Sequence, residues 1–266
     1  MIVDRSDMSR IKFDGGLSGT YENYPYITKK EIDAFLSINR SKNIQIGPMK
    51  QNEFNYFVEK SLGKFTGILF EDLRVDDLSP LEKLENIETI FLQRNIVTTK
   101  LWNMSNNSKL KNLEISHFTK LRNIDEIQTA KNLTNLWIDD GAWSSMVINT
   151  LAPLKNTKIE YIRFAPKKII DLNLEFLSGM LSLEEISFPL NFFTSEALAW
   201  MRAKIPNLKG WAIAPYFTFP DETVFICGKG KPRLKATQDN ERIAKYEKNF
   251  WQLVEYYKNN DICWRN

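Results

Sequence analysis

Apolar residues recur along most of this chain in one short pattern, an apolar residue, any residue and a second apolar residue. The pattern occurs seven times between Ile68 and Ile213, and successive copies begin 22 to 26 residues apart. The seven pairs are Ile68/Phe70, Ile90/Leu92, Leu113/Ile115, Leu136/Ile138, Ile162/Phe164, Ile186/Phe188 and Trp211/Ile213. Recurrence at this period predicts an array of stacked units that bury their apolar sides against one another.

Each pair predicts one short strand, because side chains two residues apart point to the same face of a strand. Between the pairs, apolar residues lie three apart, as in Leu121, Ile124 and Ile127, a spacing that suits a helical or 3₁₀ segment on the outer side. We therefore expect an α/β fold whose strands stack in parallel. Ile44 and Ile46, 24 residues before Ile68, indicate an eighth strand.

Both ends of the array carry different patterns. Thr28 and Glu31 form a capping-box signal that opens an amphipathic helix, and a second helix is expected around residues 53–61. Residues 1–42 are interpreted as an N-terminal cap and residues 43–215 as the repeat array, because an uncapped array would expose its stacking face.

After Pro215 the repeat stops, and residues 216–266 are interpreted as a C-terminal cap. The segment YFTFPDETVFICGKGKPRL predicts a hairpin with its turn at residues 228–232. Apolar residues at helical spacing then predict a helix over residues 239–257. This helix either closes the array or binds a partner, and the first interpretation is favoured.

The clearest repeat, DLSPLEKLENIETIFLQRN from Asp77 to Asn95, resembles leucine-rich repeats, most closely the short bacterial kind found in internalins. The resemblance covers roughly residues 65–215. It implies a curved right-handed solenoid with a parallel sheet of seven or eight strands on its concave side, where such proteins bind other proteins. The asparagine position of the repeat holds Asn only at Asn95 and Asn191, so no continuous asparagine ladder is expected.

Composition narrows the function classes. Lys and Arg number 36 against 33 Asp and Glu, and the resulting net charge of +3 is too small to indicate a nucleic-acid binder. The N-terminus lacks the apolar stretch of a secretory signal, and no apolar run approaches the roughly 18 residues of a membrane span, so a cytoplasmic location is expected. Cys227 and Cys263 are expected as reduced thiols, with no metal and no cofactor.

Strand alternation also predicts which side chains point outward, away from the core. From these positions and the strand exits we select eleven candidate partner-binding residues. They are Glu71, Asp72, Phe91, Arg94, Glu114, His117, Trp137, Asp139, Asp140, Tyr161 and Arg163.

Two properties of this set favour protein binding. Large aromatics such as Phe91, Trp137 and Tyr161, together with Arg163, are residue types that anchor interfaces. The less favoured alternative is that the aromatics pack on one another or under a terminal segment folded across the sheet. Over all outward and exit positions, six acids stand against two bases, which favours a basic partner and disfavours nucleic acid. The simpler alternative is that these acids are merely solvated.

No catalytic arrangement is evident. His117 is the sole histidine and reads as a surface residue, and the adjacent Asp139 and Asp140 lack further support as an acid–base pair or a cation site. The run at residues 228–231 lacks the spacing of a phosphate-binding loop.

We therefore expect a non-enzymatic protein-binding module, in its narrowest form an immunity or antitoxin protein that neutralises a basic toxin. The alternative is an effector or regulator whose repeats recognise a target while residues 216–266 carry activity or docking. The sequence does not predict the oligomeric state.

Overall fold

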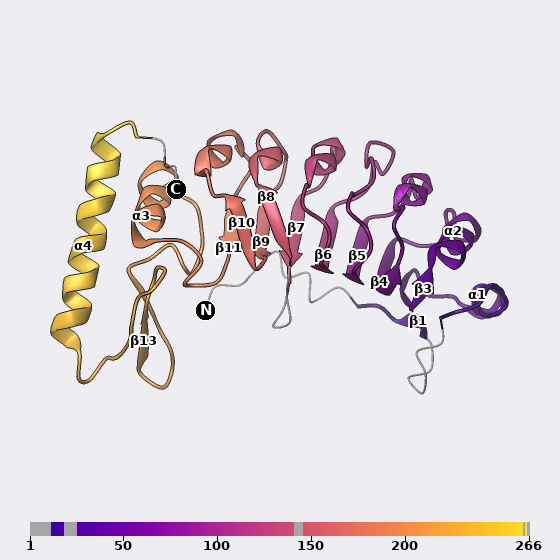
Figure 1. The fold of residues 1–266 in the computed structure, drawn as a ribbon, viewed down its shortest axis with the longest axis horizontal. Helices are drawn as coiled ribbons and strands as arrows, with labels where there is room; N and C mark the ends of the chain where they lie inside the picture. Colours follow the sequence, from indigo (N-terminus) through magenta and orange to yellow (C-terminus); the bar gives the residue numbers. More distant parts are fainter. Residues whose placement is uncertain (1–11, 19–25, 141–145, 263, 265–266) are drawn as a thin grey trace. The chain divides into compact units, whose positions relative to one another are not determined.

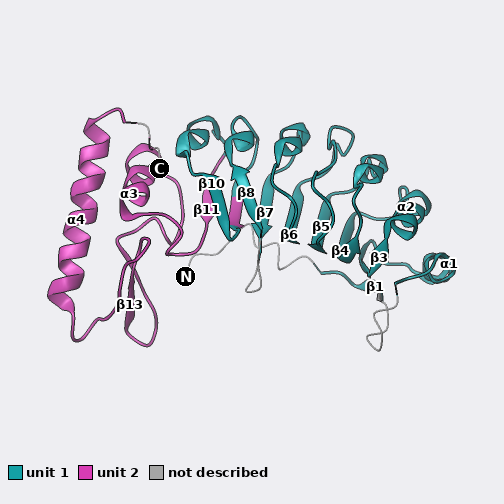
Figure 2. Cartoon of the chain, viewed as in Figure 1, with its two compact units in different colours: residues 1–161, 165–182 teal, residues 162–164, 183–266 magenta. Residues whose placement is uncertain are grey.

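The computed structural model describes residues 12–18, 26–140, 146–262 and 264. The chain divides into two compact units, each described here by itself (Figure 2). The first comprises residues 1–161 and 165–182, and the second comprises residues 162–164 and 183–266. The division of the sequence into two caps and an array follows the repeat pattern instead, and it stays a prediction.

A parallel sheet forms the centre of the first unit, with its strands side by side in the order β1, β2, β4, β5, β6, β7 (Figure 1). Neighbouring strands in this order are parallel, which confirms the predicted α/β fold with a parallel sheet of many short strands. The strands are β1 (Gly15–Ser18), β2 (Asn43–Gly47), β4 (Gly67–Arg74), β5 (Thr89–Asn95), β6 (Asn112–Phe118) and β7 (Asn135–Asp139). The predicted eighth strand is β2, whereas β1 has no counterpart in the repeat pattern.

Short 3₁₀ helices follow the strands of the first unit, as the three-residue apolar spacing predicted. They are η2 (Ser79–Lys83), η3 (Asp125–Thr129), η4 (Ala152–Leu154) and η5 (Leu174–Gly179). Two further short pairings accompany them, β3 (Met49–Lys50) beside β4 and β8 (Val147–Thr150) beside β10 (Lys168–Asp171).

Two helices precede or interrupt the first strands, α1 (Lys29–Ile38) and α2 (Gln51–Lys60). The predicted capping box opens α1: the Thr28 side chain accepts from the Glu31 backbone N–H, and the Glu31 carboxylate accepts from the Thr28 backbone N–H at 2.8 Å. Ile32 and Phe35 are the buried positions of α1, as its apolar stripe predicts.

The core of the first unit consists of equivalent residues stacked from strand to strand. Ile68, Ile90, Leu113 and Leu136 are register partners and have no exposed surface. Asn95 occupies the asparagine position of the repeat: its Nδ2 donates to the Val75 carbonyl at 2.8 Å, and its Oδ1 accepts from two backbone N–H groups of the turn. The register partners of Asn95, Leu73 and Phe118, are apolar and buried, so the asparagine contact is confined to one repeat, as expected.

The second unit combines a few repeat-like strands with a different C-terminal part. It contains residues 162–164 of β9 (Tyr161–Ala165), then β11 (Glu185–Ser187) and α3 (Ser195–Lys204). A three-stranded antiparallel sheet follows, with β12 (Tyr216–Thr218), β13 (Thr223–Ile226) and β14 (Arg233–Lys235). The last helix, α4 (Asn240–Asn259), buries Phe250, Val254 and Tyr257, which are members of its predicted apolar stripe.

One sequence expectation fails in the second unit, and another proves incomplete. Residues 211–215 form turns and bends and no strand, with only a single bridge between Glu185 and Lys209 nearby. The alternation fails here, because Trp211, expected inward, is 37% exposed and Ala212, expected outward, is 1% exposed, although Ile213 is buried as expected. The predicted hairpin is present as β13 and β14, with its turn at residues 228–232, and β12 adds a third strand through an earlier turn at Glu222, which has a φ of 64°.

Candidate interaction surface

The alternation predicted from the sequence holds in strands β4 to β7. Leu69, Phe91, Glu114 and Trp137 are register partners in the outward position, between inward residues that have no exposed surface. We call this side of strands β4 to β7 the open face. Its outward side chains are Leu69, Glu71, Phe91, Gln93, Glu114, Ser116, Trp137 and Asp139, together with Thr89, Asn112 and Asn135 at the strand starts.

Polar side chains of the open face are hydrogen-bonded from strand to strand. At the strand starts, Asn135 Nδ2 donates to Asn112 Oδ1 at 2.7 Å, and Asn112 Nδ2 donates to Thr89 Oγ1 at 3.0 Å. These residues are register partners, so each amide reaches the same position of the next repeat. The result is a short polar ladder that holds the rotamers of three neighbouring side chains.

Two candidate carboxylates are held in the same lateral way. Gln45 Nε2 donates to Glu71 Oε2 at 2.6 Å, and Gln93 Nε2 donates to Glu114 Oε1 at 3.0 Å. Ser116 Oγ donates to the same Glu114 oxygen at 3.1 Å. Glu114 is only 7% exposed, so its charge is satisfied within the sheet, whereas Glu71 remains half-buried.

The strand-exit candidates share a backbone conformation that sequence reasoning missed. Asp72, Arg94 and His117 have φ values of 50°, 64° and 57°, in the left-handed region that few residues other than glycine adopt. Each lies between two residues that remain in register with the neighbouring strands, so the strands kink together at this point and continue with no shift of register. A side effect is local charge pairing: Asp72 Oδ1 lies 3.6 Å from both Arg74 Nη2 and Arg94 Nε.

Asp140, the fourth exit candidate, is fully buried. The backbone N–H of Met146 donates to its Oδ2. Burial raises the pKa of Asp140 above its ordinary value, and the N–H groups of Met146 and Lys167 and the charge of His117 oppose this only in part. Sequence reasoning placed Asp140 on the surface; because it is enclosed, it is not part of the contact surface proposed below.

The aromatic candidates differ in exposure. Phe91 and Tyr161 are each 4% exposed, whereas Trp137 is half-buried. Phe13 lies edge-on to Phe91, with ring centroids 5.4 Å apart. Residues before β1 thus cover the open face at Phe91, one of the alternatives that the sequence left open. Arg163, which is half-buried, belongs to the second unit.

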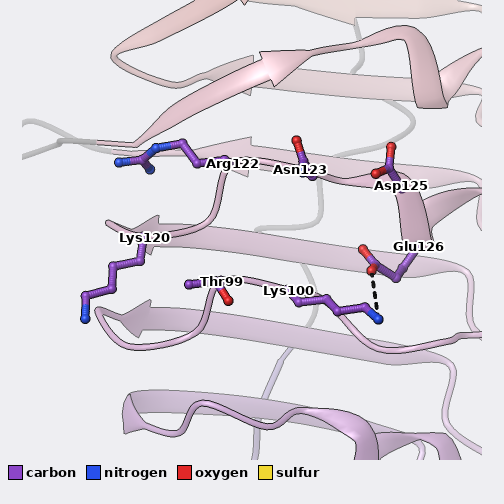
Figure 3. Close-up of a pocket in the computed structure, with 7 residues that line it drawn as sticks. All are labelled: Thr99, Lys100, Lys120, Arg122, Asn123, Asp125 and Glu126. Carbon is purple, nitrogen blue, oxygen red and sulfur yellow. Dashed lines mark ion pairs between the residues drawn. The ribbon is translucent and has the colours of Figure 1, made fainter.

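One hollow in the first unit lies away from the open face, beside the segments that follow β5 and β6. It has a volume of about 610 Å³. Figure 3 shows its lining residues, Thr99, Lys100, Lys120, Arg122, Asn123, Asp125 and Glu126. Several of its charges are already used: Lys100 Nζ lies 3.9 Å from Glu126 Oε1, and Arg122 donates to the Thr119 and Leu121 carbonyls. We therefore assign this hollow no binding role.

Other chemistry is limited in the described part of the chain. No group of three or more His, Cys, Asp or Glu side chains there could hold a metal ion. Cys227 is a buried free thiol, and burial raises its pKa to about 12, so it is a poor nucleophile at neutral pH. Cys263 lies outside the described residues. None of the described helices combines the length and the apolar character that crossing a bilayer requires.

Comparison with known proteins gives structural neighbours only. No family model and no curated protein matches the chain. An internalin (inlF) from Listeria monocytogenes is similar in structure, with 15% identity and a TM-score of 0.47 over 69% of this chain and 49% of that chain. An internalin C2 (inlC2) from the same organism has 16% identity and a TM-score of 0.46, over 69% of this chain and 73% of that chain.

This chain therefore spans about half the length of the first of these internalins. Both neighbours are of the class that the repeat DLSPLEKLENIETIFLQRN resembles. At 15–16% identity the likeness concerns the fold alone, and the architecture described above rests on the strand register of this chain itself.

Proposed function

We propose that this chain is a non-enzymatic protein-binding module and that its contact surface is the open face of strands β4 to β7. The observation that carries the proposal is the lateral hydrogen bonding of that face, in Gln45 to Glu71, Gln93 to Glu114, and Asn135 to Asn112 to Thr89. Side chains that are fixed before binding lose less conformational entropy when a partner docks. A solvated face without a binding role would not require this order.

The half-buried and exposed side chains within this frame supply the contacts. Leu69 and Trp137 offer apolar area, Gln93 offers polar groups, and Arg94 projects at the edge with 52% of its side chain exposed. Aromatic residues and arginine are enriched in protein interfaces. The open face therefore has the mixed composition of a contact surface.

A basic partner is the chemistry we propose for this surface. Glu71 and Asp139 are half-buried acids of the open face, whereas Asp72 is paired with arginines and Glu114 and Asp140 are buried. The negative charge available to a partner is thus smaller than the sequence count. It still disfavours nucleic acid, because carboxylates repel phosphates. Neutralisation of a basic toxin is the narrowest version of this proposal, and it rests on the Glu71 carboxylate.

Affinity capture with charge variants tests the proposal. The full chain is immobilised, and bound proteins are quantified from a lysate of the source cells for wild type, Glu71→Gln, Glu71→Lys and Trp137→Ala. Capture of the main partner should fall in the order wild type, Glu71→Gln, Glu71→Lys, because each step removes or reverses attraction to a basic surface. Trp137→Ala should also reduce capture, by about tenfold for an anchoring aromatic residue.

The controls are two exposed residues of the first unit outside the open face, Lys83→Glu and Leu181→Ala. Both should capture the partner as wild type does, and circular dichroism should show that all variants are folded. Equal capture by wild type, Glu71→Lys and Trp137→Ala would refute the open face as the contact surface. An acidic captured partner would refute the proposed chemistry alone.

The alternative, an effector whose activity or docking lies in residues 216–266, is favoured by one observation. The antiparallel sheet of this segment exposes aromatic side chains, including Phe219 at 38%. Phe219 is not part of the open face, so substituting it tests this alternative function separately from the function proposed for the open face.

A further inference from the structure

The antiparallel sheet of the second unit has two contrasting faces. On one face, Val224, Ile226 and Leu234 are buried and pack against Ile243 and Tyr246 of α4. On the other face, the register places Phe217 opposite Phe225, and Phe225 opposite Arg233. An aromatic residue, a second aromatic residue and an arginine therefore form one row across the three strands.

Further aromatic rings extend this row. Phe219 lies 4.9 Å, centroid to centroid, from both Phe217 and Phe225, and Trp211 lies 5.5 Å from Phe217. We call Trp211, Phe217, Phe219 and Phe225 the aromatic ladder. Trp211 is 37% exposed and Phe219 38%, and Trp211 Nε1 donates to Ser187 Oγ at 3.3 Å, which fixes the indole. Contiguous exposed aromatic side chains are typical of interaction sites, where aromatic residues are enriched.

The segment that carries the aromatic ladder has an excess of basic residues. Residues 205–238 contain five bases (Lys209, Lys229, Lys231, Arg233 and Lys235) and two acids (Asp221 and Glu222), a net charge of +3. Lys235 is paired with Asp221 at 3.9 Å. Among the described residues, no carboxylate lies within ion-pairing distance of Lys209 or Arg233. Arg233 instead lies over the Phe225 ring, with its Cζ 4.5 Å from the centroid.

The geometry of the rings discriminates between anionic partners. Trp211 meets Phe217 at an interplanar angle of 84°, Phe217 meets Phe219 at 77°, and Arg233 covers a face of Phe225. Single-stranded nucleic acids bind aromatic platforms by stacking bases on free ring faces. In each of these edge-to-face pairs one ring face is occupied by the edge of its neighbour, and Arg233 occupies a face of Phe225. Fewer faces are therefore free for stacking, and the ladder supplies apolar area with a cation at its edge. Such a surface suits apolar side chains that have carboxylates beside them.

We propose that the aromatic ladder and Arg233 form a second interaction surface, which binds an acidic peptide segment of another protein. Apolar or aromatic side chains of that segment contact Phe219 and Trp211, and its carboxylates pair with Arg233 and Lys209. This surface is separate from the open face, and it requires an acidic partner where the open face requires a basic one.

Selection from a phage-displayed library of random 12-residue peptides tests the proposal. The library is selected on the immobilised full chain after depletion on the Phe219→Ser/Arg233→Glu variant. Surviving peptides should be enriched in Asp and Glu next to Phe, Leu or Trp. The dissociation constant of one synthetic, fluorescein-labelled peptide is then measured by fluorescence anisotropy. Arg233→Glu should weaken its binding at least about tenfold, and Phe219→Ser about fivefold, as for an interface anchor.

Lys248→Glu and Trp251→Ser are the matched controls, because both residues are exposed on α4 of the same unit. Both variants should keep the wild-type dissociation constant within about twofold. Failure to enrich acidic peptides, or equal binding by wild type and Arg233→Glu, would overturn the proposal. Tighter binding of a labelled oligothymidine of 20 nucleotides than of the selected peptide would also overturn it, in favour of nucleic acid. None of these outcomes bears on the open face, whose variants are tested independently.

Discussion

The side chains on the exposed faces of the two sheets are ordered by different interactions in the two units. In the first unit, polar side chains of strands β4 to β7 bond to their counterparts in the next repeat, as Asn135 does to Asn112. In the second unit, the exposed face of β12 to β14 is built from aromatic rings packed edge to face, such as Phe217 on Phe219. One face is ordered by hydrogen bonds and the other by ring packing.

The difference follows from how each sheet is generated. In a repeat, a side chain meets the equivalent position of the next unit, so a column of like residues can bond to itself. In the antiparallel sheet, cross-strand neighbours are set by the turns, and unlike residues such as Phe225 and Arg233 become partners. The repeat period therefore determines contacts in the first unit but not in the second.

The largest expected effect comes from substituting one phenylalanine in each unit. Phe118 of β6 is fully buried, whereas Phe225 of β13 is half-buried in the aromatic ladder. Phe118→Ala should lower the free energy of unfolding by about 3–5 kcal/mol, because it leaves a cavity among stacked repeats. Phe225→Ala should cost about 1–2 kcal/mol, since much of its ring already meets water.

Urea denaturation followed by circular dichroism measures both changes. Leu181→Ala, at a residue that is 92% exposed, is the control and should stay within about 0.5 kcal/mol of wild type. A loss for Phe225→Ala as large as that for Phe118→Ala would show that the aromatic ladder is core and not surface, and would break the comparison.

A second test uses the two asparagines at the same position of the repeat pattern. Asn95, in the first unit, is 1% exposed and makes three hydrogen bonds to backbone groups. Asn95→Ala should cost about 2–3 kcal/mol, because buried backbone groups lose their partner. Asn191, in the second unit, is exposed, and Asn191→Ala should change stability by no more than about 0.5 kcal/mol. Similar losses at both positions, in thermal or urea unfolding, would contradict the confinement of this contact to the first unit.

Much of the fold could be predicted because a repeat states its architecture many times. Ile68, Ile90, Leu113 and Leu136 are inward and in register, as their spacing indicated. The prediction failed at Trp211, because the same three-residue pattern also occurs there in a turn. In that turn, the Trp211 indole donates a hydrogen bond to Ser187 and does not point into the core. Strand β1 was missed because Gly15–Ser18 carries no strand pattern and pairs only through its backbone with β2.

For the candidate site, the sequence predicted which way the side chains point but not how much of each side chain is exposed. Alternation placed Phe91 and Glu114 outward, yet both are buried, Phe91 beside Phe13 and Glu114 beside Gln93 and Ser116. Ser116 follows from the period of two, because it lies two residues along the same strand as Glu114. Gln93 and Phe13 do not, because Gln93 belongs to another strand and Phe13 to a segment outside the repeats. The aromatic ladder was missed for the same reason, although the dense aromatic segment YFTFP was its visible signal.

A third prediction concerns Asp140, where the first unit encloses a carboxylate at the end of β7. Burial raises the pKa of Asp140 in the folded state above the unfolded value of about 4. The raised pKa means that the folded state binds the proton more tightly. The contribution of protonated Asp140 to the free energy of unfolding is therefore complete below pH 4, and it is lost as the pH rises through the folded pKa.

Asp140→Asn removes this titration while keeping an oxygen for the Met146 N–H. The stability of the variant relative to wild type should therefore increase between pH 4 and pH 7, as measured by urea midpoints. Asp221→Asn in the second unit is the contrasting case, because hydrogen bonds from Thr223 lower the pKa of that exposed carboxyl. Because that pKa lies below the unfolded value of about 4, the relative stability of this variant should fall as the pH rises toward 4 and should stay level between pH 5 and pH 7. The same trend in both variants would refute the assignment.

The smallest expected effects compare one arginine from each exposed face. Arg94 pairs with Asp72 at 3.6 Å, and Arg233 lies over the Phe225 ring at 4.5 Å. Arg94→Gln should cost no more than about 0.5 kcal/mol, because the Arg94 side chain is 52% exposed and Arg74 still neutralises Asp72. Arg233→Gln should cost about 0.5–1 kcal/mol, the range for an exposed cation over an aromatic ring.

The two variants should differ more in how their stability loss depends on salt than in the size of that loss. At 1 M NaCl the screening length falls to about 3 Å, so the effect of Arg94→Gln should approach zero. Arg233→Gln should keep more than half of its effect, because the guanidinium also packs its apolar stem and planar face on the ring. Urea unfolding at 0.05 M and 1 M NaCl measures both. If salt abolishes both effects equally, Arg233 acts only as a charge near the ladder, and ring packing then does not order the face of the second unit at this position.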